Sequence, residues 1–485
     1  MRHIRFVTVA VALAVVLLAG CVRHGSIRQE ASGFESAECL EDFSDSGHRV
    51  DCGWMQVPES REAPSGRQVR FPVVIVRARS AAKADPVFYL HGGPGGGVID
   101  GLAQRLRDGE LPLTADRDWI FFDQRGTGLS RPRLDCGRLE LSDLGLSSDL
   151  AVDDAIDCGR SLSREGVDLA QYHSSVVVDD LLALRRALGA GRFNLYGVSY
   201  GGRVVLETMR RAPSGLRAVV LDSPWAPEAN WTQPLPGLVA DQLREVLALC
   251  DDDPDCHAEH PALAERLHQW LSVWLNQPPT RRGHRYAAEE VVAYVLDALY
   301  DDDATQALPD SLEVLMNGDF DDLDRFLEAQ SDYVEGQFFS TLCREELPFE
   351  DAGVVDQDTS SPGNDDDPVR IAATRAVRRL FAACSGFAVG AKDASDNLPV
   401  ISATPTLLLA AQIDAGCPAD EVLSAASWLR RGQAFTLPNT THAPAERSPC
   451  ARRMLADFLD RPRRAVDARC VSIERPRFPF RLRRG

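Results

Sequence analysis

The sequence has no excess of positive charge and no paired-cysteine metal motif, and its N-terminal apolar run is short. It contains 72 acidic and 53 basic residues, giving a formal net charge of −19. Because phosphate binding needs a basic face and none is evident, nucleic acid is not expected as a partner. The twelve cysteines include no C-x-x-C pair, so no metal site is expected. The apolar run at 7–18 is too short to span a membrane comfortably.

The N-terminus carries the pattern of an export signal. Arg2 and Arg5 precede the apolar run, and a Leu-Ala-Gly-Cys motif follows, ending at Cys21. This resembles a bacterial lipoprotein signal, in which Cys21 becomes the lipidated first residue. Three acyl chains would hold the protein firmly on a membrane, at about 0.8 kcal/mol per buried methylene. Val22 gives no acidic retention signal, so we expect the periplasmic face of the outer membrane. An ordinary cleaved signal peptide is the alternative.

The cysteine content agrees with export, because disulfides persist outside the cytosol. Removing Cys21 leaves eleven cysteines, an odd number. Sequence alone does not fix connectivity. Nearest-neighbour pairing predicts Cys39–Cys52, Cys136–Cys158, Cys250–Cys256, Cys343–Cys384 and Cys450–Cys470, with Cys417 left as a free thiol.

Apolar runs typical of buried strands alternate with helical patterns in two blocks of the chain. The strand-like runs are at 70–77, 86–90, 119–122, 193–196, 216–221, 404–410 and 434–437. Helical spacing appears at 176–188, 421–430 and 450–459. This alternation predicts an α/β fold, with a mostly parallel sheet flanked by helices.

Between the two blocks the chain is acidic and helical, with no convincing strand. Helices are expected at 239–249, 263–275, 287–299 and 312–328. Aspartate runs at 251–253, 301–303 and 365–367 lack the pattern of a calcium loop and are read as solvated loops. The predicted organisation is a signal at 1–20, a lead-in of flap or hairpin type at 21–70, core segments at 71–225 and 396–485, and a helical cap at 226–395.

A Gly-x-Ser-x-Gly motif at 197–201 joins a predicted strand to a predicted helix. A serine on such a sharp turn lies in strained backbone, with its hydroxyl raised above the sheet. Gly197 and Gly201 are expected because a side chain at either position would collide with a neighbouring element. The motif therefore predicts Ser199 as a nucleophile, provided that a base and an acid follow it.

His442 is the histidine that follows the last predicted strand, where a base would lie. The usual order in this kind of fold is Ser, Asp or Glu, then His, each after the carboxyl end of a strand. Asp414 follows the preceding strand and comes 28 residues before His442. We therefore predict Asp414 as the acid, with Asp222 and Asp420 as rivals.

Two backbone N–H groups are needed to hold the oxyanion formed during acyl transfer. Tyr200, directly after the serine, supplies one. The glycine-rich loop at 91–97 is expected to supply the other, with Gly93 favoured and Gly92 next. A phosphate-binding reading of this loop fails because no lysine follows it.

Three motifs together resemble a known family. His-Gly-Gly-Pro-Gly-Gly at 91–96, Asp-Gln-Arg-Gly-x-Gly-x-Ser at 123–130 and Gly-x-Ser-Tyr-Gly-Gly at 197–202 look like the proline iminopeptidase and tripeptidyl aminopeptidase branch of the α/β-hydrolases. The resemblance implies an α/β-hydrolase fold with an inserted helical cap. It also implies cleavage of short peptides from a free N-terminus, without a cofactor.

The resemblance assigns the triad to Ser199, Asp414 and His442, while Asp123 and Arg125 brace loops. This chain departs from the family in having Thr rather than Gly before His442, and in the residues that follow Asp414.

A Cys-x-Glu stretch also resembles the family and suggests Glu345 as the group that binds the substrate ammonium. A plain surface glutamate is the alternative for Glu345. The favoured prediction is an exported serine aminopeptidase. An esterase or lactonase on the same triad, or a non-catalytic binding lipoprotein, are the other hypotheses.

Overall fold

A nine-stranded sheet forms the centre of the protein. The structure is a computed structural model that describes residues 33–80, 84–137, 149–329, 333–355, 366–473 and 478–482. The strand order is β1-β2-β3-β5-β4-β6-β7-β10-β11. The strands are β1 (Phe34–Ala37), β2 (Val50–Pro58), β3 (Gln68–Val76), β4 (Ala84–Leu90), β5 (Arg117–Phe122), β6 (Phe193–Val198), β7 (Leu216–Asp222), β10 (Thr406–Ala411) and β11 (Gly432–Leu437). Pairs from β5 to β11 are parallel and those from β1 to β5 antiparallel, so the predicted mostly parallel sheet is confirmed.

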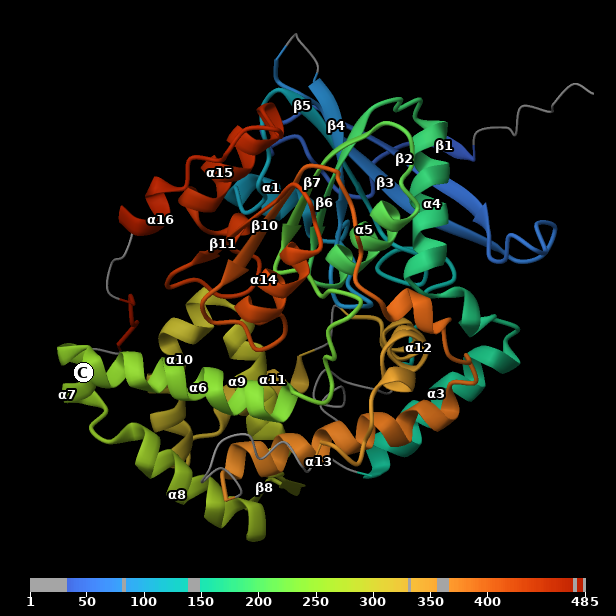
Figure 1. The fold of residues 1–485 in the computed structure, drawn as a ribbon. Helices are drawn as coiled ribbons and strands as arrows, with labels where there is room; N and C mark the ends of the chain where they lie inside the picture. The colour runs from blue at the N-terminus through green and yellow to red at the C-terminus, as the bar shows by residue number, and fades with distance from the viewer. Residues whose placement is uncertain are drawn as a thin grey trace, which may run out of the picture. The chain divides into compact units, whose positions relative to one another are not determined.

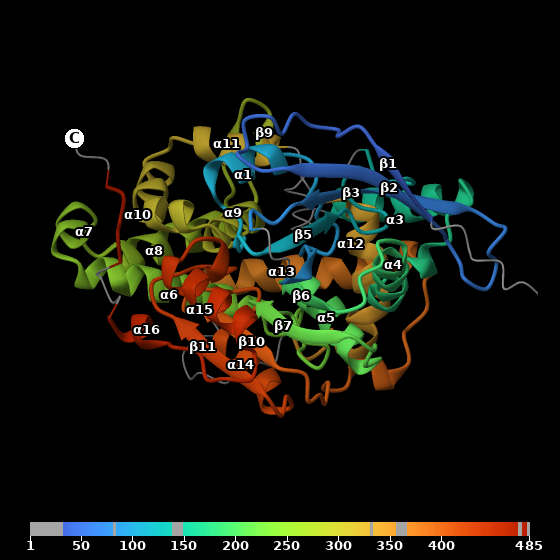
Figure 2. The ribbon, with the colours of Figure 1, turned by 90° about the horizontal axis from the view of Figure 1, so that it is seen from above.

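Helices cover both faces of this sheet (Figure 2). Neighbouring strand residues point to opposite faces, and Leu195 and Tyr196 accordingly belong to different apolar clusters. One face packs against α3 (Asp149–Arg164), α4 (Ser174–Ala187), α5 (Tyr200–Arg210) and α14 (Ala419–Ser427). The other packs against α1 (Leu102–Asp108) and α15 (Pro449–Asp460). The fully buried strands read as continuous apolar runs because both faces are covered.

The predicted cap is a set of helices (Figure 1), most of which share an apolar core of their own. The side chains of α12 (Glu335–Glu345) belong instead to the apolar cluster on one face of the sheet. Its helices are α6 (Leu235–Asp252), α7 (Pro254–Glu259), α8 (Leu263–Asn276), α9 (Ala288–Tyr300), α10 (Asp302–Met316), α11 (Asp321–Glu328), α12 (Glu335–Glu345) and α13 (Pro368–Ala383). The single helix predicted at 312–328 is wrong. Gly318, with φ of 88°, ends α10 and a second helix begins after it.

Two short features of the cap were not predicted from the sequence. The strands β8 (Thr280–Arg281) and β9 (His284–Arg285) form a small hairpin that the helical pattern conceals. The aspartate runs are more than solvated loops. Asp253, Asp301 and Asp367 each accept hydrogen bonds from the first backbone N–H groups of a helix. Aspartate satisfies donors that otherwise have no partner within a helix.

The lead-in segment extends the sheet, because β1 and β2 pair antiparallel with it. The five predicted disulfides are confirmed, and among the cysteines that the structure describes Cys417 is the free one, and it is buried. The predicted lipidation site, Cys21, lies outside the described residues. Within the part of the chain that the structure describes, no helix is both long and apolar enough to cross a membrane.

Candidate active site

Ser199 occupies the sharp turn between β6 and α5. Its backbone is strained, with φ of 55° and ψ of −126°. A Cβ at Gly197 would lie 2.6 Å from the Gly201 carbonyl oxygen, and one at Gly201 would overlap the Leu90 carbonyl. Both glycines are therefore required for the turn to form. The geometry raises the Ser199 hydroxyl at the carboxyl end of the sheet, as the motif predicted.

His442 and Asp414 come together at the same end of the sheet. Asp414 follows β10 and His442 follows β11, and His442 Nδ1 lies 2.8 Å from Asp414 Oδ2. The other oxygen of Asp414 accepts backbone hydrogen bonds from Gly416 at 3.1 Å and Cys417 at 2.8 Å. These bonds fix the carboxylate, which in turn orients the imidazole and leaves Nε2 directed away from Asp414.

The charges around His442 favour its protonated form. Burial alone would lower the pKa of His442, but the Asp414 carboxylate, helped by Asp222 and Glu446, raises it above its ordinary value of 6.5. His91, in the glycine-rich loop, behaves in the opposite way. Burial and then Arg105 lower the pKa of His91 to about 4, so its imidazole is neutral at physiological pH.

Neither rival acid contacts His442. Asp222 accepts hydrogen bonds from the Tyr196 hydroxyl at 2.5 Å and the Ala445 backbone at 3.1 Å, which shapes the loop that carries His442. Burial, together with Glu446, raises the pKa of Asp222 to about 7. Asp420 is exposed at the start of α14. Asp414 is thus the carboxylate that the structure pairs with His442.

A cavity of about 430 Å³ contains both Ser199 and His442. The core contributes the two catalytic candidates and the glycine-rich loop, and the cap contributes the opposite wall. The cap side chains in the wall are mainly apolar, including Trp231, Leu235, Val239, Val292, Leu296 and Phe338. The cavity is therefore suited to an apolar group held next to the serine.

The two predicted oxyanion donors, Gly93 and Tyr200, both belong to backbone segments beside Ser199. A Cβ at Gly92 would lie 2.7 Å from Ser199 Cβ, so this loop passes directly by the serine. Gly92 and Gly93 both line the cavity, and Gly93 has φ of 114°. Tyr200 is the first residue of α5, where backbone N–H groups have no partner within the helix.

Cys417, which the sequence analysis left without a role, lies at this site. Its thiol lies close to the Ser199 hydroxyl. Burial, with the Asp414 carboxylate next, raises the pKa of the Cys417 thiol well above its ordinary value. No sequence signal identifies this proximity, because it depends on how the loop after β10 folds back toward the serine.

Three consecutive cap residues hold the loop that carries His442. The Tyr300 ring packs edge-on against the imidazole, with 4.8 Å between ring centres. A side chain at Gly416 would overlap the Tyr300 hydroxyl. Asp302 accepts hydrogen bonds from the Thr441 backbone at 2.9 Å and its hydroxyl at 2.6 Å. Asp301 similarly pairs with Arg447 at 2.7 Å. The junction of α9 and α10 is therefore fastened to the catalytic loop.

The structure does not bring Glu345 to the cavity. Its side chain is fully buried behind α5, where it accepts a hydrogen bond from the Tyr200 hydroxyl at 3.1 Å and pairs with Lys392 Nζ at 2.9 Å. Burial would raise the pKa of Glu345, but Lys392, His173 and Arg203 hold it well below its usual range. Glu345 is therefore an internal ion-pair partner. It neither faces the cavity, as an ammonium-binding group would, nor lies on the surface, so both predictions for it are wrong.

Four other carboxylates line the cavity, and none of them was predicted from the sequence as a site residue. Glu289 pairs with Arg379, Asp301 with Arg447, and Glu446 with Arg105. Asp297 differs, because no hydrogen bond or ion pair to its side chain occurs among the described residues. Partial burial and then the nearby Asp301 raise its pKa.

Asp123 and Arg125 brace loops, in agreement with the resemblance. Asp123 accepts backbone hydrogen bonds from Val98, Ile99 and Leu129. Arg125 makes two hydrogen bonds to Asp180, at 2.7 and 2.8 Å. Neither residue lines the cavity.

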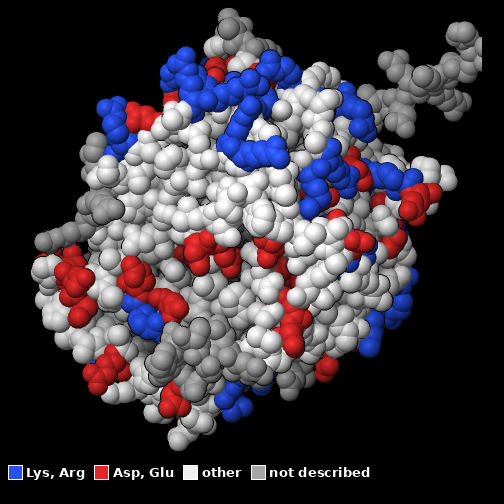
Figure 3. All heavy atoms as spheres, in the orientation of Figure 1, with Lys and Arg blue, Asp and Glu red and all other residues white. Residues whose placement is uncertain are grey.

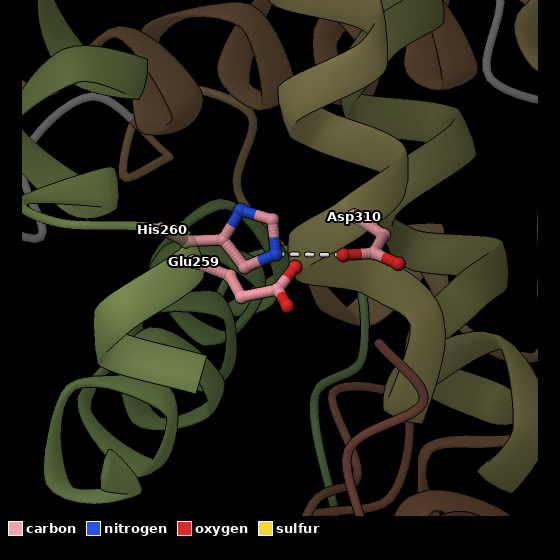
Figure 4. A group of neighbouring side chains, drawn as sticks. All are labelled: Glu259, His260 and Asp310. Atoms are coloured by element: carbon pink, nitrogen blue, oxygen red, sulfur yellow. Dashed lines mark hydrogen bonds and ion pairs between the residues drawn. The ribbon is translucent and has the colours of Figure 1, made fainter. Parts of the chain in front are cut away.

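The residues best placed to hold a metal ion lie elsewhere in the cap. Figure 4 shows Glu259, His260 and Asp310, whose ligand atoms all lie within 4.8 Å of one another. The Nε2 atom of His260 is 2.6 Å from Asp310 Oδ1, so these two groups already satisfy each other. None of the three lines the catalytic cavity, and we assign them no part in catalysis.

Comparisons with known proteins identify the family. A family model described as alpha/beta hydrolase fold matches residues 85–445. The chain is 26% identical to the serine protease Hip1 of Mycobacterium tuberculosis over 304 residues, which cover 56% of this chain and 57% of Hip1. It is 25% identical to the tripeptidyl aminopeptidase of Streptomyces lividans over 213 residues, which cover 40% and 39% of the two chains. The matched part of the chain thus spans little more than half the length of Hip1 and about two fifths of the length of the tripeptidyl aminopeptidase.

The fold is also similar to solved structures. They include the proline iminopeptidase of Mycobacterium smegmatis, with a TM-score of 0.39 and 16% identity over 84% of this chain and 98% of that one. They also include an esterase of Thermogutta terrifontis, with a TM-score of 0.38 and 16% identity over 85% of this chain and 99% of that one.

Proposed function

The chain belongs to the α/β-hydrolase family, and we propose that it is a serine hydrolase that releases N-terminal residues or short peptides from peptide substrates. The observation that carries the proposal is the Asp414–His442 hydrogen bond beside the cavity that also contains Ser199. The names of the relatives, serine protease and tripeptidyl aminopeptidase, support a peptidase.

In the proposed reaction, Ser199 Oγ attacks the substrate carbonyl carbon and its proton passes to His442 Nε2. Asp414 holds His442 in the required orientation and stabilises the imidazolium. The N–H groups of Tyr200 and Gly93 hold the oxyanion of the tetrahedral intermediate. When the C–N bond breaks, His442 returns the proton to the leaving amine. Water then hydrolyses the acyl-enzyme through the same base and releases Ser199.

We further propose that Asp297 binds the ammonium group of the substrate. This role requires a carboxylate that faces the cavity and is not already paired, and Asp297 meets both conditions. Glu345 meets neither, because it is buried with Lys392. An ammonium next to Asp297 would also offset the repulsion between Asp297 and Asp301.

A matched pair of chromogenic tripeptide anilides, one with a free N-terminus and one acetylated, tests this function. We expect wild type to cleave the free-amine substrate, and Ser199→Ala to abolish cleavage. Asp297→Asn is expected to raise KM for that substrate by about ten- to a hundredfold, because a charge-assisted hydrogen bond is lost. Asp303→Asn, an exposed cap residue outside the cavity, is the control. Equal cleavage of both peptides by wild type would contradict a requirement for the free amine.

The apolar wall of the cavity favours an esterase as the second candidate, since the triad does not distinguish an ester from an amide. Turnover of a short-chain ester through Ser199, with no cleavage of either peptide, would establish it. A fluorophosphonate probe addresses the non-catalytic hypothesis. Labelling of wild type but not of Ser199→Ala would exclude it. The proposed site of action is a membrane surface outside the cytosol, through a lipid anchor on Cys21.

A further inference from the structure

A basic groove of about 880 Å³ lies at the end of the sheet where the parallel strands begin. Seven arginines line it, and no acidic side chain occurs among the described residues of its lining. The arginines are Arg192, Arg210, Arg217, Arg431, Arg461, Arg463 and Arg464. They come from the segment before β6, the end of α5, the start of β7, the turn before β11 and the segment after α15. We call this surface the basic groove.

Three of these arginines have no carboxylate partner. Arg192 and Arg217 share Asp85 at 3.4 and 3.5 Å. Arg210 pairs with Glu207 of its own helix, and Arg461 pairs with Asp457 of α15. For the remaining three, no ion pair occurs within the described chain; these are Arg431, Arg463 and Arg464, all exposed. The groove therefore carries uncompensated positive charge.

The basic groove could not be predicted from the sequence. A chain with a net charge of −19 gives no sign of a basic face, and the arginines are spread over more than 270 residues. The expectation that no basic face exists is therefore wrong. Figure 3 shows basic side chains gathered at the top of the view, over α15 and the starts of the central strands, whereas acidic side chains lie mainly over the cap.

The groove and the catalytic cavity lie at opposite ends of the sheet. Ser199, Asp414 and His442 follow the carboxyl ends of β6, β10 and β11. Arg192 and Arg431, in contrast, precede the amino ends of β6 and β11. Because these strands are parallel, a partner bound in the groove would leave the cavity open on the far side.

An exposed apolar side chain lies among the arginines. Ile401 lines the groove and is 65% exposed. Leu398, close by in sequence, is 56% exposed. Arginines that surround exposed aliphatic side chains are typical of surfaces that meet lipid headgroups, where the cations contact phosphate and the apolar side chains enter the interface.

We propose that the basic groove docks onto a membrane surface rich in anionic phospholipids. Guanidinium groups bind phosphate oxygens in a forked geometry, which suits this partner. The inference rests partly on the proposed lipid anchor at Cys21. Twelve residues from Cys21 to Gly33 reach about 40 Å when extended. From β1 to β7 there are six strand spacings, roughly 29 Å in all. An anchored chain can therefore bring the groove to the same membrane.

Vesicle sedimentation tests the docking without the anchor. The test uses the chain from residue 22 onward, because residues 33–485 form one compact unit that contains the whole sheet. We expect binding to vesicles of phosphatidylcholine with about one third phosphatidylglycerol, and no binding to pure phosphatidylcholine. Salt near 0.5 M should abolish the binding, because the groove is exposed to solvent. Equal binding to both kinds of vesicle would overturn the proposal.

Arg431→Ala/Arg464→Ala should weaken binding to the anionic vesicles by about thirtyfold, since each surface arginine contributes about fivefold. The matched control is Arg285→Ala/Arg375→Ala. It removes the same charge from two exposed cap arginines that lack a carboxylate partner among the described residues. A similar loss in both double variants would show that overall charge, and not the groove, governs binding. That result would overturn the proposal.

Two further measurements distinguish membrane docking from nucleic-acid binding and from the proposed peptidase activity. Binding of duplex DNA by the wild type, lost in Arg431→Ala/Arg464→Ala and accompanied by no vesicle binding, would assign the groove to nucleic acid instead and overturn the lipid proposal. Peptide hydrolysis in vesicle-free solution should be unchanged in both double variants. Failure of all proteins to hydrolyse peptide would contradict the proposed function alone, while the vesicle result would still decide the docking.

Discussion

The Cys417 thiol lies close to the Ser199 hydroxyl, and Cys417 is the one described cysteine outside the disulfides. Cys417 also donates its backbone N–H to Asp414, so this residue hydrogen-bonds the acid and lies near the serine. Its side chain is 3% exposed. The thiol is therefore buried near the serine and is not accessible to reagents in solution.

The first prediction is that iodoacetamide at about pH 8 leaves the native protein active and Cys417 unmodified. Alkylation requires the thiolate, and burial together with Asp414 raises the pKa of this thiol. For the chain from residue 22 onward, which lacks Cys21, intact-mass measurement should show no added group in the native protein and one after unfolding without reductant. Loss of activity in proportion to alkylation of Cys417 in the native protein would contradict the predicted inert thiol.

The second prediction concerns the acid of the triad. Asp414→Asn should lower kcat by about 10⁴-fold, because the amide no longer selects the required tautomer of His442. Asp420→Asn, on the exposed rival acid, should stay within about twofold. Steady-state kinetics on the free-amine peptide measures both. A comparable loss in the two variants would argue against Asp414 as the acid.

The third prediction is the position of the acid limb of the pH profile. The base must be neutral to accept a proton, and its pKa is raised, so it keeps its proton to a higher pH. The value of kcat/KM should therefore rise with pH around a midpoint above 6.5. His91, whose pKa is about 4, cannot produce this limb. In Asp414→Asn the residual activity should show a lower midpoint, because burial then dominates. An unmoved midpoint would assign the limb to another group.

The fourth prediction tests the cap junction. Asp302→Ala should reduce kcat by about tenfold, since the loop next to His442 loses two hydrogen bonds and the imidazole is less well held. Thermal unfolding should move by only a few degrees. Asp303→Ala, on the adjacent aspartate that pairs with Arg481 at the surface, serves as control and should leave kcat unchanged. Identical kinetics for the two variants would show that the junction does not position His442.

Features that depend on a single short segment, or on residues close together in the sequence, could be predicted. The turn at Ser199 could be predicted because Gly197 and Gly201 mark it within one short segment, even though the Leu90 carbonyl of a neighbouring strand is what excludes a side chain at Gly201. His442 and Asp414 could be predicted because each follows a buried strand. The five disulfides followed from proximity along the chain, since the enclosed loops are short, with the longest separation being 41 residues.

Features that depend on long-range packing could not be predicted in the same way. Glu345 follows a family-like Cys-x-Glu stretch, yet Lys392, 47 residues later, neutralises it in the interior. Asp297 lies on a helix with an acidic, unremarkable sequence, and only the fold shows that it faces the cavity. The break between α10 and α11 was missed because apolar spacing continues across Gly318.

Tyr300 occupies the space above Gly416 that any side chain would need. The cap and the acid loop therefore fit each other at a position where no other residue can be substituted without moving one of them. As a result, the cap is not an interchangeable module. A grafted cap without a tyrosine in the place of Tyr300 would no longer fit this loop, and the segment 414–417 would have to be transferred with it. In this protein, diversification of the cap is constrained by the geometry of the catalytic acid.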